Sequence, residues 1–235
     1  MADEQRRVLA VSAHPDDIEF GAGGTVARWT DEGWEVRYVI ATRGQKGVQD
    51  VDADLEAFGR VREEEARAAA AICGVTDVTF LDYMDAEVPY GLGLQRDIAR
   101  AFRHHRPHRL LALDPAILPT DEFVNHPDHR AVAMATLDIV VTGGTTAAIF
   151  PELIRDEGLE PWQGLEDIWI MGPAGGDEVV DITTTVDRKL DSLRAQPSQI
   201  GDWDVDTFMR ERLARRGEPH GYAYAESFRV IDRRR

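Results

Sequence analysis

The chain has 235 residues, of which 43% are hydrophobic and 30% are charged, so it is long and apolar enough to fold around a sizeable core. Its 27 basic and 43 acidic residues give a net charge of −16, which argues against binding nucleic acid or an anionic membrane through a general basic field. The N-terminal residues include no apolar signal-peptide stretch and no run is long enough to span a membrane, so we expect a cytoplasmic protein.

The first half of the chain alternates short apolar runs with helical patterns. Strands are expected at 7–13, 35–42, 78–83 and 109–114, with helices between them at 23–33, 59–74 and 94–105. Gly33 and Gly74 are placed to end two of these helices. The single cysteine, Cys73, excludes an intramolecular disulfide, and its alanine-rich surroundings indicate a small buried residue rather than a nucleophile. The alternation predicts an α/β fold with a mostly parallel sheet and helices on both faces.

The pattern is less regular after residue 143. Further strands are expected at 167–172, 178–183 and 227–231, and helices at 184–196 and 206–217. No internal repeat, low-complexity tract or convincing linker interrupts the chain. We therefore expect one domain over residues 1–235.

Two similar polar motifs lie next to strands of the predicted sheet. HPDD, at 14–17, directly follows the first strand, and NHPDH, at 125–129, lies on the connection after the fourth. Ligands bind at the carboxyl ends of strands in open parallel sheets, so both motifs are expected at the same edge.

The spacing within the motifs suits a metal site. His14 and Asp17 are three residues apart at a strand-to-helix turn, and so are His126 and His129 if a helix begins near Asn125. A catalytic zinc ion takes three protein ligands, commonly histidines and a carboxylate, and keeps one position open for water. The motifs contain more candidates than ligands, so the others are available to handle protons.

The other histidines are interpreted as surface residues or satisfied core residues. This group consists of His104, His105, His108 and His220, the first three in a charged, arginine-rich stretch.

The stretches AHPDDIEFGAGGT and NHPDHRAV resemble the LmbE-like, or PIG-L, zinc-dependent de-N-acetylases. Weaker similarities, among them ATRGQKG, LDYMD and YAESFRV, extend the resemblance over nearly the whole chain. Members act on N-acetylglucosamine linked to inositol, malate or phosphatidylinositol, and on small chitooligosaccharides. The resemblance implies a Rossmann-like (LmbE-like) sheet without dinucleotide.

The resemblance also implies an activity. The protein is expected to be a hydrolase that removes an acetyl or related acyl group from the amide nitrogen of an N-acyl amino sugar or glycoconjugate. Metal-bound water would be the nucleophile, with Zn²⁺, or another divalent ion such as Fe²⁺ or Co²⁺, as the metal. The expected partner is thus a small molecule, with no nucleic acid or membrane, and relatives suggest a homo-oligomer.

The resemblance also implies a separate role for each polar residue of the two motifs. They make His14, Asp17 and His129 the metal ligands and Asp16 the general base. His126 would stabilise the oxyanion or protonate the leaving amine, with Asp128 orienting or charging it. Arg43, after the second strand, is a candidate for contact with substrate hydroxyls or an anionic aglycone; an ordinary surface arginine is the alternative.

Three positions depart from the family pattern and concern the substrate rather than the reaction. Gln45 stands where members often have glutamate, Val124 where some have tyrosine, and Gln196 where many have histidine.

Three other interpretations of these residues fit the sequence less well. A dinucleotide-binding loop needs Gly-x-Gly-x-x-Gly or Ala, but counting from Gly21 and Gly23 leads to Val26. A non-haem iron oxygenase could use two histidines and a carboxylate, but the alternation of strands and helices does not favour it. A non-catalytic family member acting as a carbohydrate-binding or scaffold subunit would be signalled by loss of a ligand or the base, and all are present.

Overall fold

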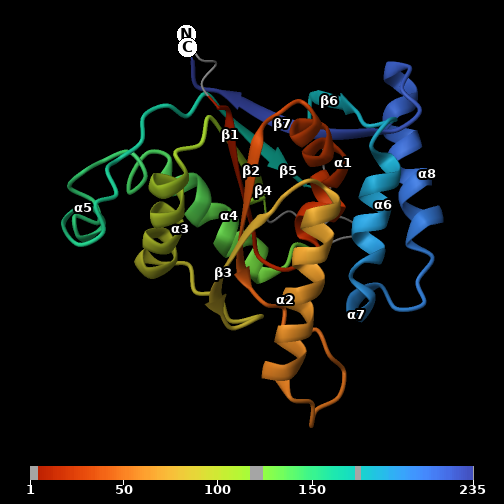
Figure 1. The fold of residues 1–235 in the computed structure, drawn as a ribbon, viewed down its shortest axis with the longest axis horizontal. Helices are drawn as coiled ribbons and strands as arrows, with labels where there is room; N and C mark the ends of the chain where they lie inside the picture. The colour runs from red at the N-terminus through yellow and green to blue at the C-terminus, as the bar shows by residue number, and fades with distance from the viewer. Residues whose placement is uncertain (1–4, 117–123, 173–175, 235) are drawn as a thin grey trace.

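A seven-stranded sheet forms the centre of the computed structural model, which describes residues 5–116, 124–172 and 176–234 (Figure 1). The order across the sheet is β3-β2-β1-β4-β5-β7-β6. Strands β1 to β5 pair in parallel, and β7 runs antiparallel to both β5 and β6. The strands are β1 (Arg7–Ser12), β2 (Glu35–Thr42), β3 (Asp77–Tyr83), β4 (Arg109–Leu113), β5 (Asp167–Met171), β6 (Glu178–Asp181) and β7 (Ala225–Asp232). The predicted α/β fold with a mostly parallel sheet is confirmed.

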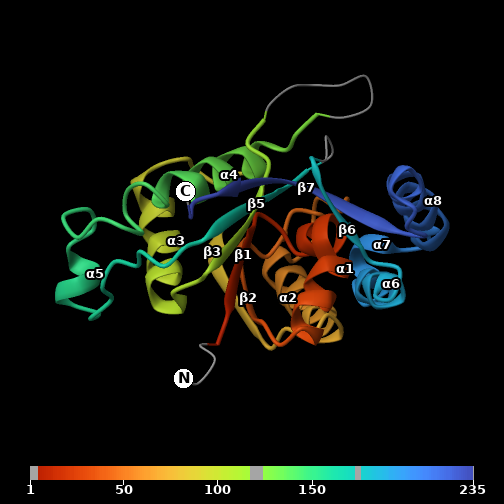
Figure 2. The ribbon, with the colours of Figure 1, turned by 90° about the horizontal axis from the view of Figure 1, so that it is seen from above.

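Helices cover both faces of the sheet (Figure 2). Helices α3 and α4 pack together on one face, and α1, α2 and α6 pack together on the other, with α8 beside α6 and β7. The helices are α1 (Asp17–Asp31), α2 (Leu55–Ile72), α3 (Leu92–His105), α4 (Pro127–Ile139), α5 (Glu152–Arg155), α6 (Val186–Arg194), α7 (Pro197–Ile200), α8 (Val205–Gly217) and the short 3₁₀ helix η1 (Glu218–His220). None of the helices in the described ranges is long and apolar enough to cross a membrane.

The first helix begins earlier than predicted. Helix α1 starts at Asp17, directly after the first motif, and not at residue 23. The prediction was wrong because glycines disguise the helical pattern there. Close packing explains one of them: a Cβ on Gly21 would lie 2.7 Å from the Sδ atom of Met171 at the end of β5. The short helix α5 was not predicted at all.

The strand order reverses beside β1. The chain passes from β1 to β2 on one side and returns through β4 on the other, and β1 pairs in parallel with both. Such a reversal leaves a crevice outside the carboxyl ends of the two central strands. The first motif follows β1 and the second, which follows β4, forms the start of α4, so the topology directs both toward this crevice.

A buried ion pair fixes α1 against β7 and α6. The Lys189 ammonium donates to a Glu226 carboxylate oxygen over 2.6 Å and to the backbone carbonyls of Glu19 and Phe20. Glu226 also accepts from the backbone amides of Gly24 (3.1 Å) and Thr25 (2.7 Å). Lys189 and Glu226 are therefore paired with each other and further satisfied by backbone groups. A buried ion pair is tolerated in a core under this condition.

Cys73 is fully buried, as the sequence indicated. Burial, together with the nearby Glu19 carboxylate, raises the pKa of its thiol to about 12. A thiol held so firmly in its protonated form is a poor nucleophile.

Candidate active site

The first motif presents one carboxylate oxygen of Asp17 to the crevice. Its Oδ2 atom accepts hydrogen bonds from the backbone amides of Ala13 (3.0 Å) and His14 (2.8 Å). The Oδ1 atom lies 3.0 Å from Nε2 of His129, which belongs to the second motif. The turn thereby fixes the carboxylate and leaves one oxygen directed at a histidine more than a hundred residues away.

The second motif opens helix α4. Pro127 is the first helical residue, where its missing N–H costs nothing, and His126 is the N-cap. The Nδ1 atom of His126 accepts the Asp128 backbone N–H over 3.2 Å. His129 lies in the first turn, and its Nε2 atom is 3.1 Å from Nδ1 of His14. The two motifs therefore meet.

The geometry of His14, Asp17 and His129 fits a tetrahedral metal ion. The two histidine nitrogens are 3.1 Å apart, Asp17 Oδ1 is 3.0 Å from the His129 nitrogen, and the nearest Asp17 oxygen is 3.8 Å from the His14 nitrogen. Zinc bonds of about 2.0–2.1 Å in a tetrahedron place ligand atoms about 3.3 Å apart. Two imidazoles and a carboxylate are also a common donor set for catalytic zinc.

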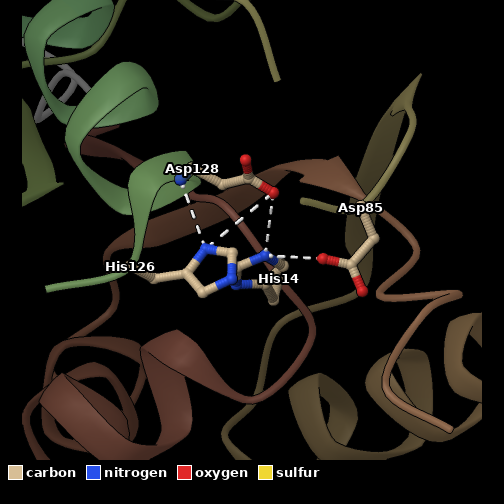
Figure 3. A group of neighbouring side chains, drawn as sticks. All are labelled: His14, Asp85, His126 and Asp128. Atoms are coloured by element: carbon tan, nitrogen blue, oxygen red, sulfur yellow. Dashed lines mark hydrogen bonds and ion pairs between the residues drawn. The ribbon is translucent and has the colours of Figure 1, made fainter. Parts of the chain in front are cut away.

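His14 is held from its other side by two carboxylates (Figure 3). Its Nε2 atom lies 3.2 Å from Oδ2 of Asp128 and 3.1 Å from Oδ1 of Asp85. Asp128 is in turn fixed by the backbone amides of Ala86 (2.7 Å) and Val88 (3.2 Å). A carboxylate on the far nitrogen of a ligating histidine fixes the ring orientation and the tautomer, leaving Nδ1 free to bind metal.

A second cluster, His14 with Asp85, His126 and Asp128, also brings four possible ligand atoms, one from each residue, within 4.8 Å of one another. It fits a metal less well. The His126 Nδ1 atom lies 4.0 Å from Asp128 Oδ2 and already accepts the Asp128 amide, and both Asp128 oxygens accept backbone amides. This cluster is better suited to orienting His14.

The electrostatics of the site favour a bound cation. Although burial lowers the pKa of His14, hydrogen bonds to Asp128 and Asp85 and the Asp17 charge raise it to about 10. Although burial raises the pKa of Asp17, His129 and His14 hold it at about 2. The carboxylates thus stabilise positive charge where the three donors converge, which is the position a divalent ion would occupy.

Asp16 has a separate environment. Its backbone is in the left-handed region, with φ of 86°, and its Oδ2 atom is 3.2 Å from a guanidinium nitrogen of Arg62. Arg62, only 3% exposed, also donates to the carbonyls of Pro15 and Gly44. Burial and the adjacent Asp17 carboxylate raise the pKa of Asp16 to about 7, against the opposing effect of Arg62. A carboxylate with such a pKa can accept a proton near neutral pH.

His126 is the most exposed of the site histidines, with 40% of its side chain accessible. Burial and the nearby His14 lower its pKa. Since a backbone N–H can only donate, Nδ1 is an acceptor and the neutral ring carries its proton on Nε2. Asp128 lies nearer to His14 than to the His126 ring, so its side chain is better placed to orient the former.

Arg43 lies at the carboxyl end of β2 but is occupied by protein carboxylates. Its guanidinium pairs with Glu56 (2.8 Å), Asp82 (2.6 Å) and Glu63 (3.5 Å). Its contact with substrate stays a prediction.

The three positions that depart from the family pattern lie in different environments. Gln45 and Gln196 are buried, and their amides donate to the Tyr83 carbonyl (3.4 Å) and a Glu19 carboxylate oxygen (3.3 Å). Val124 is 73% exposed.

Two residues of the site escaped the sequence analysis. Asp85 ends the LDYMD stretch quoted for its resemblance, and Arg62 lies in the helix predicted at 59–74. A buried arginine within a charged helical pattern carries no local signal of its role, whereas Asp85 could have been found as a carboxylate following the third parallel strand.

A cavity of about 300 Å³ opens beside Asp17 and His129. It extends past the ends of β4 and β5 to helix α8. The donor cluster therefore borders a space large enough for one ring-sized group.

Comparisons with known proteins identify the family of this chain. The sequence model of the PIG-L family, described as GlcNAc-PI de-N-acetylase, matches residues 9–140. The chain is 29% identical to the diacetylchitobiose deacetylase of Thermococcus kodakarensis, covering 97% of this chain and 84% of that protein. It is 31% identical to a 1D-myo-inositol 2-acetamido-2-deoxy-alpha-D-glucopyranoside deacetylase of Actinosynnema mirum, covering 84% and 82%. The structure of the N,N'-diacetylchitobiose deacetylase from Pyrococcus horikoshii, complexed with its inhibitor MPG, superposes with a TM-score of 0.88 at 30% identity, covering 97% and 85%.

Proposed function

This chain belongs to the PIG-L family of de-N-acetylases, and from that premise we propose that it is a metal-dependent hydrolase of N-acyl amino sugars or their conjugates. It would remove an acetyl or related acyl group from the amide nitrogen. The observation that carries the proposal is the meeting of two distant motifs, with His14 Nδ1 and Asp17 Oδ1 3.1 and 3.0 Å from His129 Nε2.

His14, Asp17 and His129 would hold the metal. A divalent ion held there acts as a Lewis acid on the amide carbonyl and lowers the pKa of water that it binds. Zn²⁺ suits the donor set best, and Fe²⁺ or Co²⁺ would accept the same nitrogen and oxygen ligands. Asp85 and Asp128 hold the His14 ring in the orientation that this binding requires.

Asp16 would be the general base. Its carboxylate follows His14 by two residues and precedes Asp17, so it lies against the ligand set without belonging to it. Arg62 holds one of its oxygens, which fixes the carboxylate and keeps part of its charge. The other oxygen is then available to take a proton from the attacking water and to pass it on.

His126 would act on the amide itself. Its Nε2–H, fixed by the bond that Nδ1 accepts, can donate to the carbonyl oxygen as negative charge develops there. A proton for the departing amine would come from the same ring atom or from Asp16. The Asp128 backbone N–H, rather than its carboxylate, orients this ring.

A non-catalytic binding or scaffold role is not favoured. The residues proposed as ligands, base and oxyanion donor are all present, and the three proposed ligands converge, whereas a scaffold would not need to retain them. Contact of substrate with Arg43 would require one of the carboxylates around its guanidinium to give way.

A deacetylation screen tests the proposal. Purified protein loaded with Zn²⁺ is incubated with N-acetylglucosamine, diacetylchitobiose and N-acetylglucosaminyl conjugates. Released acetate and free amine are both measured and should appear in equal amounts. A chelator should abolish the release and added Zn²⁺ should restore it. His104→Gln, which removes an exposed histidine away from the site, is the matched control and should keep full activity. Failure to release acetate from every substrate, or release that persists without metal, would refute the proposal.

A further inference from the structure

The cavity beside the metal centre has an aromatic wall. Phe20, on α1, stacks on Trp203 with ring centroids 5.9 Å apart and an interplanar angle of 25°. Trp203 in turn contacts Phe208, on α8, at 5.1 Å. All three rings line the cavity, and Trp203 and Phe208 are 46% and 43% exposed. Exposed aromatic side chains that border a cavity offer flat faces to a ring-shaped ligand.

The same cavity is lined by an arginine without a carboxylate partner. Arg212 lies four residues after Phe208 on α8, hence on the same side of the helix. Within the described ranges no hydrogen bond or ion pair occupies its guanidinium. Arg216, one turn further, also lines the cavity, and burial together with Arg212 lowers its pKa.

Each of the three carboxylates among the described lining residues has a partner of its own. Glu226 is held by Lys189 and two backbone amides. Asp114 accepts the Ala116 amide and lies 4.0 Å from a guanidinium nitrogen of Arg229. Asp17 belongs to the metal ligands. Among the described residues that line the cavity, Arg212 is therefore the cationic group that remains available to a ligand, and its charge selects an anion.

We propose that the cavity is a substrate subsite that binds a ring-sized, largely apolar group carrying a carboxylate or phosphate, with Trp203 and Phe208 against the ring and Arg212 on the anion. The inference rests on the proposed function, because it assigns the cavity to the part of the substrate next to the scissile amide. The volume of about 300 Å³ accommodates one ring rather than a chain of sugars. The anion can belong either to the group glycosidically linked to the sugar or to the acyl group, and the test separates the two.

The test compares matched pairs of substrates. The first pair is the phenyl and 4-carboxyphenyl glycosides of N-acetylglucosamine, and the second is N-benzoyl- and N-(4-carboxybenzoyl)glucosamine, with the freed amine measured for each. Arg212→Gln removes the charge, Arg212→Lys keeps it, and Arg215→Gln removes an exposed charge of the same helix as control. Trp203→Ala removes part of the aromatic wall.

Arg212→Gln should lower kcat/KM for the carboxylated member of one pair about tenfold more than for its uncharged counterpart. Arg212→Lys should recover part of this loss, and Arg215→Gln should change neither rate. Trp203→Ala should lower kcat/KM for the aromatic glycosides relative to the methyl glycoside of N-acetylglucosamine. The pair that responds identifies which side of the amide enters the cavity. An equal effect of Arg212→Gln on charged and uncharged members, or no effect in either pair, would overturn the inference while leaving the proposed deacetylation intact.

Direct binding separates the two failures. Calorimetric titration of the 4-carboxyphenyl glycoside and of N-(4-carboxybenzoyl)glucosamine into zinc-loaded Asp16→Asn protein needs no turnover. At least one compound should bind more weakly by about tenfold when Arg212→Gln is added. If the wild-type protein deacylates nothing, the proposed function fails, and these titrations still decide whether the subsite exists.

Discussion

Substitution of Asp16 separates its catalytic role from its structural one. Asn in its place keeps the volume, tolerates the φ of 86°, and retains an oxygen for Arg62. It removes only the ability to accept a proton. Asp16→Asn should therefore retain the metal and the fold but lose about 10² to 10⁴ in kcat, the usual contribution of a general base.

Asp16→Ala should cost more, for reasons that can be added up. A left-handed conformation costs about 1–2 kcal/mol in a residue that does not tolerate it. Arg62, 3% exposed, keeps its two carbonyl partners but loses the side-chain oxygen at position 16, and a hydrogen bond of a charged group is worth about 1.5–3 kcal/mol. Asp16→Ala should therefore be about 2.5–5 kcal/mol less stable than Asp16→Asn, which likewise lacks the buried charge, and this corresponds to a Tm lower by roughly 10 °C for a chain of this length.

The assay measures zinc content, kcat and Tm on wild type, Asp16→Asn and Asp16→Ala prepared in parallel. Both variants should be inactive, and Asp16→Ala alone should melt early. Substantial turnover by Asp16→Asn would refute the general-base role. Loss of zinc from Asp16→Asn would make Asp16 a ligand instead, and equal melting temperatures of the two variants would refute the account of Arg62 and the backbone.

Three further predictions concern the ligands, their support and the stability of the fold. His129→Gln should abolish both metal binding and activity. Metal analysis that finds one equivalent of bound metal in this variant would show that His129 is not a ligand. Asp128→Asn should weaken metal affinity by about 10- to 100-fold, measured by competition with a chelator, because it loosens the His14 ring; unchanged affinity would contradict this support. Burial lowers the pKa of His105 from 6.5 to about 4, so the folded state favours the neutral ring; its contribution to stability is complete above pH 6.5 and is lost as the pH falls toward 4. Between pH 7.5 and 5 the free energy of unfolding of the wild type should fall by about 2 kcal/mol from this residue, as measured by urea unfolding. His105→Gln, whose amide can keep the bond to the Val8 carbonyl, should lack this decrease. Parallel pH profiles of the two proteins would contradict the prediction.

The sheet could be predicted because its strands are short, apolar and separated by helical patterns. The predicted run at 35–42 coincides with β2, and the other strands of the parallel region differ by one residue at an end. Helix α1 was misplaced because its first turns carry Gly21, Gly23 and Gly24, which oppose helix formation locally. Tertiary contact overrides that preference: a Cβ on Gly24 would lie 2.7 Å from Ile182. Such a requirement belongs to the packed structure and leaves no periodic signal in the sequence.

The meeting of the two motifs was predictable for a topological reason. Parallel strands place their carboxyl ends at one edge, so polar residues after the first and fourth strands converge even though 109 residues lie between Asp17 and Pro127. What could not be predicted is the division of labour around His14. Nothing in the order of residues states that Asp128 bonds its Nε2 atom while the adjacent His129 meets its Nδ1 atom.

The two ring nitrogens of His14 explain why the motifs occur as a pair. One nitrogen must be held so that the other can bind metal, and the second motif supplies both contacts from a single helical turn, through Asp128 and His129. The first motif likewise supplies Asp17, the proposed ligand, and Asp16, the proposed base, but it relies on Arg62 from α2 to hold the latter. Each motif is therefore incomplete without residues from elsewhere in the fold, and the crevice at the strand reversal is the place where the first turns of α1 and α4 meet and where Arg62 of α2 reaches Asp16.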